Sequence, residues 1–166
     1  MFSFCELHTL TSNFDKGSLC TDNESPMDVT LALLADAANV SQEGKLNILG
    51  AFANINAVEF PARHPEMQLV LRFEASPAEA ETNKRLEVKI LDEDGQAIGG
   101  FGGEFKVSAA TSGQRIRMQT VMRILDAVFP RPGDYTFAVL IDDKTEYEVP
   151  LSLTLMTAGE EKNDGD

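Results

Sequence analysis

The stretch that decides the fold is 146-EYEVPLSLTL-155, near the end of the chain. Its large apolar side chains occupy every second position, at Tyr147, Val149, Leu151, Leu153 and Leu155. Successive side chains of a β-strand point to opposite faces, whereas an α-helix would scatter these residues around its axis. The stretch therefore predicts a strand with one buried face. Pro150 cannot donate a backbone hydrogen bond, so we expect this strand to lie at a sheet edge or to bulge there.

The same period of two recurs in six earlier runs. These runs are residues 29–35, 46–52, 69–75, 86–90, 116–124 and 135–141. Turn-forming residues separate the runs, at 42–44, 61–65, 93–95, 130–133 and 142–144. One polar face favours antiparallel pairing, because parallel strands are usually covered on both faces. We predict an all-β chain, an antiparallel two-sheet β-sandwich of seven or eight strands, immunoglobulin-like or C2-like in arrangement.

Composition narrows the possible partners. The chain has 166 residues, of which 43% are hydrophobic and 25% charged, as in an ordinary globular domain. Asp and Glu number 27 against 14 Lys and Arg, which gives a formal net charge of −13. Nucleic acid and anionic lipid both require a concentrated positive field, so we expect neither as a partner. The two cysteines, Cys5 and Cys20, make no disulfide framework in an intracellular chain.

Three regions differ in their patterning. Residues 1–26 show no periodicity and lack the features of a secretory signal, so we expect a cytoplasmic protein. Met27 directly precedes the patterned region, and we therefore predict that 1–26 is a disordered extension or a mis-assigned start. Residues 27–156 are predicted to form the β-sandwich domain. Residues 157–166 carry four acids and no large apolar side chain, which predicts an acidic flexible tail.

Two neighbouring blocks, 31-LALLADAAN-39 and 44-GKLNILGAF-52, resemble a bacterial family of uncharacterised proteins catalogued only as a domain of unknown function. The resemblance continues through His64-Pro65 and closes with 129-FPRPGDYTF-137, and it spans essentially residues 28–155. It implies a small bacterial cytoplasmic β-sandwich. It brings no activity and no catalytic residue with it.

Five carboxylates lie in two predicted hairpin loops: Asp92, Glu93 and Asp94 in one, Asp142 and Asp143 in the other. If these loops were neighbours at one end of the sandwich, their oxygens could coordinate Ca²⁺. Aspartate is also common in tight turns for conformational reasons alone, and we favour that explanation. We assign no catalytic, cofactor-binding or metal residue, and keep Asp92, Asp94, Asp142 and Asp143 as Ca²⁺ candidates.

Asp36 and Asn39 are predicted to lie where the first strand gives way to a loop, with Lys45 near enough to neutralise Asp36. They could form a polar recognition edge, but both residue types also cap local turns through their own backbone, which we favour. In 99-GGFGG-103 no Lys-Ser/Thr follows, so it is not a phosphate loop. These glycines instead indicate a bulge or a close crossing of chains, with Phe101 pointing inward.

Arg115, Arg117 and Arg123 share one face of a predicted strand. They could bind an acidic partner. The commoner arrangement is cross-strand pairing with glutamates, such as Glu87 or Glu104, on a solvated face.

Catalysis has little support. Residues 27–156 contain one histidine, His64, and no cysteine, so Ser-His-Asp chemistry would depend on that one imidazole, which we place in a turn. A carboxylate pair could hydrolyse glycosides, but so small a sandwich offers no obvious cleft. We expect a non-enzymatic module that contacts another protein through an edge strand or a loop end, with homo-oligomers also possible. The second hypothesis is a Ca²⁺- or small-ligand-binding sandwich.

Overall fold

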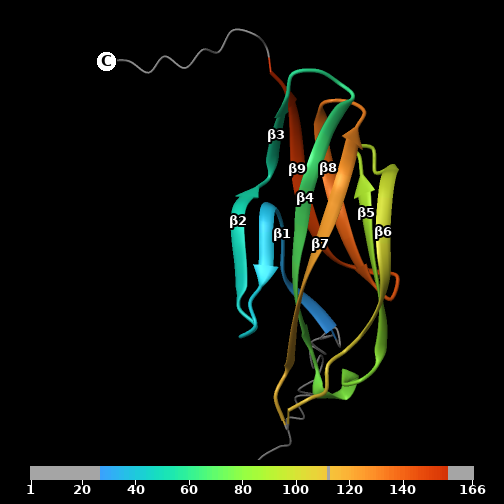
Figure 1. The fold of residues 1–166 in the computed structure, drawn as a ribbon. Coiled ribbons are helices and arrows are strands. Elements are labelled where there is room, and N and C mark those ends of the chain that lie inside the picture. Colours follow the sequence, from blue (N-terminus) through green and yellow to red (C-terminus); the bar gives the residue numbers. More distant parts are fainter. Residues whose placement is uncertain (1–26, 112, 157–166) are drawn as a thin grey trace, which may run out of the picture.

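The computed structural model describes residues 27–111 and 113–156, which form two β-sheets (Figure 1). The predictions for residues 1–26 and 157–166 lie outside the described residues. Nine strands occur in the described ranges: β1 (Met27–Val40), β2 (Leu46–Phe52), β3 (Asn54–Ala57), β4 (Ala62–Ala75), β5 (Asn83–Leu91), β6 (Ala97–Lys106), β7 (Ile116–Phe129), β8 (Gly133–Ile141) and β9 (Lys144–Leu155). The 3-10 turn Pro77–Glu79 separates β4 from β5. No helix within these ranges is long and apolar enough to cross a membrane.

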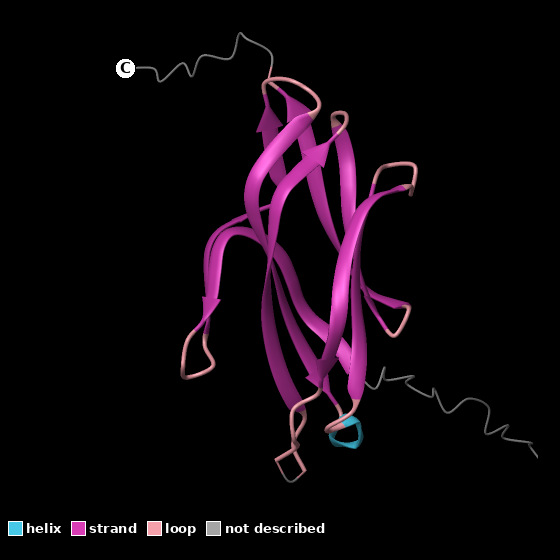
Figure 2. Cartoon of the chain, turned by 45° about the vertical axis from the view of Figure 1, so that its right-hand side comes forward, coloured by secondary structure: helices cyan, strands magenta, loops and turns pink. Residues whose placement is uncertain are grey.

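The strands divide into a sheet of four and a sheet of five. Sheet A has the order β2-β1-β4-β7, and sheet B has the order β3-β9-β8-β5-β6. All neighbouring strands are antiparallel except β3 and β9, which are parallel, so the prediction of a purely antiparallel fold was wrong for this pair. The chain leaves sheet A after β2 and continues into sheet B at Ala53, whose carbonyl accepts a hydrogen bond from the Ser152 N–H at 2.8 Å. Figure 2 shows the long twisted strands running along the molecule.

One apolar core lies between the sheets, and the period-two runs supply it. Met67, Leu69, Leu71 and Phe73 enter it from β4, and Tyr135, Phe137 and Val139 enter it from β8. Complete burial of a large apolar side chain stabilises the fold by about 2 kcal/mol. The ring of Tyr135 meets that of Phe129 edge-on at 5.0 Å, and its hydroxyl donates to the Arg131 carbonyl at 2.8 Å, so the polar end of this buried side chain is satisfied.

The described residues form nine strands rather than the predicted seven or eight, because β3 and β6 show no alternation of apolar and polar residues in the sequence. β3 has only four residues, too few for an alternation to show. β6 contains Gly99, Gly100, Gly102 and Gly103, and glycine is depleted in strands. The predicted close crossing is nevertheless present. A Cβ on Gly102 would overlap the carbonyl oxygen of Leu86, and one on Gly100 would lie 2.9 Å from that of Val88.

Each of the two strand prolines, Pro65 and Pro150, has a paired strand on one side only within the described residues. Pro65 was predicted in a turn, yet it belongs to β4. β1 pairs with β4 only as far as Gln68, so near Pro65 the strand has a neighbour on one side alone within the described residues. Pro150 lies in β9 before Ser152, where pairing with β3 begins. The prediction that this strand lies at a sheet edge or bulges at Pro150 is wrong, because β9 lies between β3 and β8 and its register shift falls elsewhere. Pro150 is tolerated because β3 pairs with β9 only from Ser152 onward.

Candidate functional site: the groove between β6 and β7

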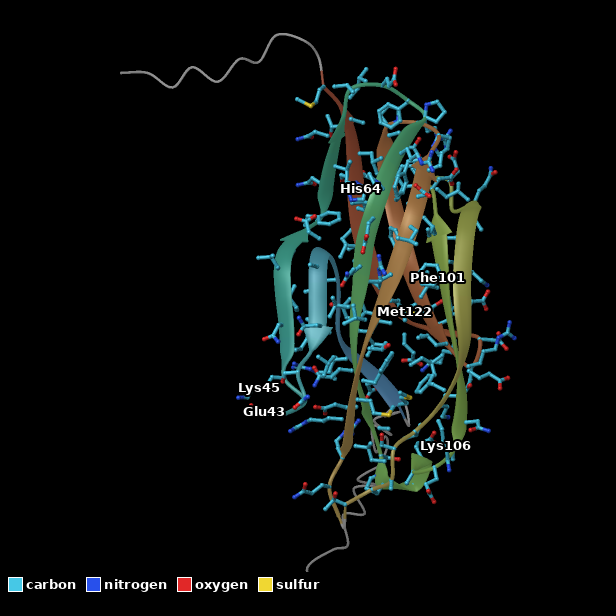
Figure 3. All side chains as sticks on the ribbon, in the orientation of Figure 1. Glu43, Lys45, His64, Phe101, Lys106 and Met122 are labelled. Carbon is cyan, nitrogen blue, oxygen red and sulfur yellow. The ribbon has the colours of Figure 1, made fainter. Side chains whose placement is uncertain are left out.

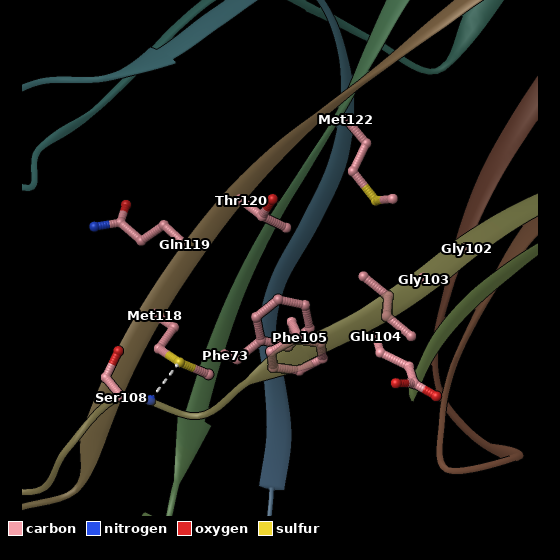
Figure 4. Close-up of a pocket in the computed structure, with 11 residues that line it drawn as sticks. Phe73, Gly102, Gly103, Glu104, Phe105, Ser108, Met118, Gln119, Thr120 and Met122 are labelled. Carbon is pink, nitrogen blue, oxygen red and sulfur yellow. Dashed lines mark hydrogen bonds between the residues drawn. The ribbon is translucent and has the colours of Figure 1, made fainter. Parts of the chain in front are cut away.

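β6 and β7 are terminal strands of their sheets, and a groove of about 480 Å³ opens between them (Figure 4). Its lining comes from β4 to β7 and the segment after β6: Phe73, Leu86, Gly102, Gly103, Glu104, Phe105, Ser108, Met118, Gln119, Thr120 and Met122. Among the described residues, each of the two strands has a paired neighbour on one side only. The groove is therefore bordered by two free strand edges.

Gly103 opens the groove. It pairs with Leu86 of β5, whose side chain is buried in the core, so a side chain at position 103 would point inward as well. A Cβ built on Gly103 would meet no atom within 4 Å. The missing side chain leaves space between the sheets, which Phe105, two residues further along β6, lines but does not fill (Figure 4). A glycine at this one position thus creates the apolar space.

Two phenylalanine rings form the floor of the groove, and two methionine side chains form its wall. Phe73 of β4 and Phe105 of β6 stack across the two sheets with their ring centroids 5.6 Å apart. Met118 and Met122 project from the inner face of β7, where they oppose the core residues Phe73 and Leu69. The Met118 sulfur accepts a hydrogen bond from the Ser108 N–H at 3.3 Å. Methionine adapts its shape to what it contacts, so this wall can accommodate different apolar groups.

The electrostatics of the groove offer little acid–base chemistry. Glu104, at the rim, is the only titratable side chain among the described lining residues. Gln119 and Thr120 add neutral polar groups. Such a lining recognises apolar groups and backbone amides.

A second surface is formed by the end of β1, the following turn and β2, residues 36–50, which we call the arm. The last β1–β4 pair joins Ala35 to Gln68, and beyond it β1 pairs only with β2. Two glutamines of sheet A hold the arm. The Gln68 Oε1 atom accepts a hydrogen bond from the Ala38 N–H at 2.7 Å, and the Gln119 Nε2 atom donates to the Gly44 carbonyl at 2.5 Å. The tip of the arm therefore reaches β7, with Glu43 and Lys45 exposed beside it (Figure 3).

Comparison with known protein families matches residues 30–154 to DUF6941, a family of unknown function. The chain belongs to this family. The resemblance predicted for residues 28–155 is confirmed. No curated protein matches the chain.

Two solved structures illustrate what this DUF6941 chain is similar to. One is the alkylpurine DNA glycosylase AlkC of Pseudomonas fluorescens bound to DNA containing an abasic site analog, at 17% identity and a TM-score of 0.45. The match covers 78% of the DUF6941 chain and only 30% of the glycosylase chain. The other is an immunoglobulin-like protein of Pseudomonas aeruginosa, at 15% identity and a TM-score of 0.38, with 80% of this chain and 99% of that chain covered.

The two acidic loops of the DUF6941 chain do not meet. β5 runs antiparallel to β8, with Leu86 opposite Ile141 and Leu91 opposite Thr136, so the loop after Leu91 and the loop after Ile141 lie at opposite ends of sheet B. This register contradicts the premise of the Ca²⁺ hypothesis. In the described ranges no three His, Cys, Asp or Glu side chains lie close enough together to hold a metal ion.

Each acidic loop instead pairs with its own cation. Arg131 Nη2 lies 3.1 Å from Asp92 and 2.8 Å from Asp94, and the hydrogen bond with Asp94 raises the pKa of this guanidinium. At the other end, Asp142 accepts hydrogen bonds from the Arg85 N–H and from Lys84, each at 3.0 Å. The backbone hydrogen bond from Arg85, followed by that from Lys84, lowers the pKa of Asp142. These contacts fix loops, and the sequence did not single out Arg131 or Lys84.

Asp36 and Asn39 lie in β1 rather than in a loop, because β1 continues to Val40. The Asp36 carboxylate lies over Gly50, where a Cβ would overlap it, while Lys45 pairs with Glu43 at 2.6 Å instead of with Asp36. Asn39 accepts a hydrogen bond from the Asn47 amide of β2 at 2.9 Å. The prediction that Asp36 and Asn39 cap a turn is therefore wrong. Both residues lie in the part of β1 that runs beside β2 in the arm.

Arg117 and Arg123 of β7, and Arg115 directly before it, pair with acids, as predicted, but these acids belong to sheet A. Arg117 bonds Glu74 at 2.9 Å and Arg123 bonds Glu66 at 2.9 Å. Arg115 lies 2.9 Å from Asp28. Glu87 and Glu104 belong to sheet B, so the named partners were wrong. Which acids lie beside these arginines depends on the order of the strands in the sheets, and the sequence does not reveal that order.

His64 lies in strand β4 and not in the predicted turn. Its ring is half-buried and tilted against that of Phe52, with the centroids 5.7 Å apart. It lines two recesses beside β3 and is not among the residues that line the groove between β6 and β7.

Proposed function

We propose that this chain is a non-enzymatic, immunoglobulin-like β-sandwich module that binds an extended segment of a partner protein in the groove between β6 and β7. The observation that carries the proposal is the apolar space opened by Gly103 between two free strand edges. An added strand gains main-chain hydrogen bonds from an edge, and a neighbouring pocket selects alternate side chains. Both parts of such a site occur together here.

The lining indicates the chemistry of the bound segment. Phe73, Phe105, Met118 and Met122 favour an apolar side chain, of the size of leucine or phenylalanine, inserted between the sheets. The neighbouring side chains of an extended segment point away from the pocket and are free to be polar. A segment with alternating apolar and polar residues therefore fits the groove best.

Two features support binding rather than catalysis. Glu104 is the only titratable side chain among the described lining residues, and general acid–base catalysis needs a positioned acid or base near the reacting group. His64 lines other recesses and is not among the lining residues of the groove. The net charge of −13 in turn favours a protein partner over nucleic acid.

Peptide display on the full chain tests the proposal. The expected selection is a set of short peptides with alternating apolar residues. Gly103→Leu fills the groove with a side chain and is expected to abolish their binding. Gly99→Ala is the matched control, because Gly99 lies in the same strand outside the groove and an added Cβ makes only an ordinary contact with Ile90 at 3.8 Å.

Binding that survives in folded Gly103→Leu, or that is lost equally in Gly99→Ala, contradicts the proposed site. Selection of no peptide by the wild-type chain contradicts the proposed function. The folding of each variant is checked by its thermal melting curve, so that loss of binding is not mistaken for loss of structure.

A further inference from the structure

We propose that the segment bound in the groove carries a lysine or an arginine next to its inserted apolar residue, and that Glu104 selects this cation. The inference rests on the proposed function and names the chemistry of the partner segment more closely. It comes from a second recess, of about 380 Å³, which β5 and β6 form and which Glu104 also lines.

The two faces of β6 differ in what they contact. Phe101 and Phe105 pack against the core, and successive side chains of a strand point to opposite faces, so Gly102 and Glu104 lie on the outer face of sheet B. Figure 4 shows the carboxylate of Glu104 turned away from the ring of Phe105. Glu104 therefore lies at the rim of the groove with its carboxylate on the outer face.

The second recess lies on this outer face. Its lining includes Arg85 and Glu87 of β5, which lie opposite Glu104 and Gly102 in the register. Residues directly opposite each other share one face of a sheet. Gly100 and Gly102 also line the recess and have no side chains to fill it. The methylene groups of a lysine or an arginine can lie over this glycine backbone while the charged end reaches a carboxylate.

The charge of Glu104 has no ion pair with any described residue. Arg85 lies opposite it, but the Arg85 guanidinium approaches Asp143 at 3.7 Å instead. Lys106, the next outward residue of β6, lies 3.6 Å from Glu81. The cations nearest to Glu104 in the register and along the strand thus pair with other acids, and its carboxylate is available to a cation of the bound segment.

The position of Glu104 fits a cation next to the inserted residue. In a strand added to the edge of β6, the residue opposite Gly103 points into the groove, and the residues before and after it point to the outer face. One of these neighbours lies opposite Glu104. Opposite charges in such a cross-strand pair stabilise the pairing, and like charges destabilise it. The net charge of −13 adds a long-range attraction for a basic segment.

Three synthetic peptides test the inference on the full chain. They share the apolar residues of a peptide selected by display, and they carry lysine, glutamine or glutamate at the two positions that flank the inserted residue. The wild-type chain is expected to bind the lysine peptide about fivefold more tightly than the glutamine peptide, and the glutamate peptide more weakly than both. Fluorescence anisotropy measures the three dissociation constants, and added salt is expected to reduce their differences.

Two substitutions at Glu104 and one control assign the preference to this carboxylate. Glu104→Lys is expected to bind the glutamate peptide more tightly than the lysine peptide, and Glu104→Gln to bind all three within about twofold of one another. Glu148→Lys makes the same change of net charge at an exposed position of β9, which β8 and β5 separate from β6. It is expected to keep the wild-type order of affinities.

Equal binding of the three peptides by the wild-type chain overturns the inference and leaves the groove itself in place. So does a preference for lysine that persists in Glu104→Lys, or one that Glu148→Lys removes to the same extent. Thermal melting curves show that each variant is folded. Binding of none of the peptides contradicts the proposed function, and the inference with it.

Discussion

At the scale of single residues, two adjacent glycines of β6 have opposite roles. Gly102 allows β5 and β6 to approach closely, because a Cβ there would overlap the Leu86 carbonyl. Gly103 faces open space and leaves the groove unfilled. The sequence predicts the close crossing from the run of glycines, but the spacing of the residues cannot show which glycine is required by packing and which one opens a cavity.

The first prediction concerns this pair. Gly103→Ala is expected to raise the free energy of unfolding by about 0.5–1 kcal/mol, because alanine restricts the unfolded chain and meets no obstacle in the fold. Gly102→Ala is expected to lower it by about 1–3 kcal/mol, since the backbone of β5 has to move. Urea denaturation measures both. Equal effects of the two substitutions would contradict the assigned roles.

At the same scale, Asp142 makes stability depend on pH. Its pKa is lowered from the ordinary value of 3.8, so its contribution to stability is present above that value and is lost as the pH falls through the lower pKa of the folded state. Asp142→Asn is therefore expected to reduce stability at neutral pH and to have a smaller effect in strong acid. Asp143→Asn, in the same hairpin, is the control. If the urea midpoints of Asp142→Asn and of the wild-type chain differ by the same amount at every pH, this account is contradicted.

At the scale of elements, the alternating runs predict seven of the nine strands in the described residues. Branched and aromatic residues at every second position indicate both that a segment is a strand and which of its faces is buried. The sequence does not predict β3 or β6. β3 is too short to show an alternation, and β6 has glycine at four positions where side chains would have shown one. The extension of β1 through Asp36 and Asn39 is missed for another reason. Polar residues there suggest a turn, whereas pairing with β2 and the side chain of Gln68 keep the backbone extended.

The arm yields a prediction at this scale. Gln68→Ala removes the acceptor of the Ala38 N–H, and a lost hydrogen bond of this kind costs about 1 kcal/mol. Exchange of the Ala38 amide is expected to become about fivefold faster, while amides in the centre of β8 keep their rates. Gln119→Ala is expected to act in the same way at the tip. Unchanged exchange throughout the arm in both variants would show that the two glutamines do not hold it.

At the scale of the whole molecule, the two-sheet all-β class follows from the sequence, and the distribution of the strands between the sheets does not. Side-chain alternation reports which face of a strand is buried but not which strand lies next to it. That is why the arginines on and just before β7 were given partners in the wrong sheet, and why the sequence left open whether the two acidic loops are neighbours. It is also why the groove escaped prediction, since it exists only because β6 and β7 end their sheets side by side.

The most direct test of the groove is a methyl NMR titration of the full chain, labelled at methionine, with a displayed peptide. The account predicts that the methyl signals of Met118 and Met122 shift on binding, while those of Met67, buried in the core, and Met156, beyond the end of β9, stay in place. The same titration of Gly103→Leu is expected to leave all of these signals unchanged. Saturable binding that leaves the Met118 and Met122 signals unmoved in the wild-type chain would contradict it.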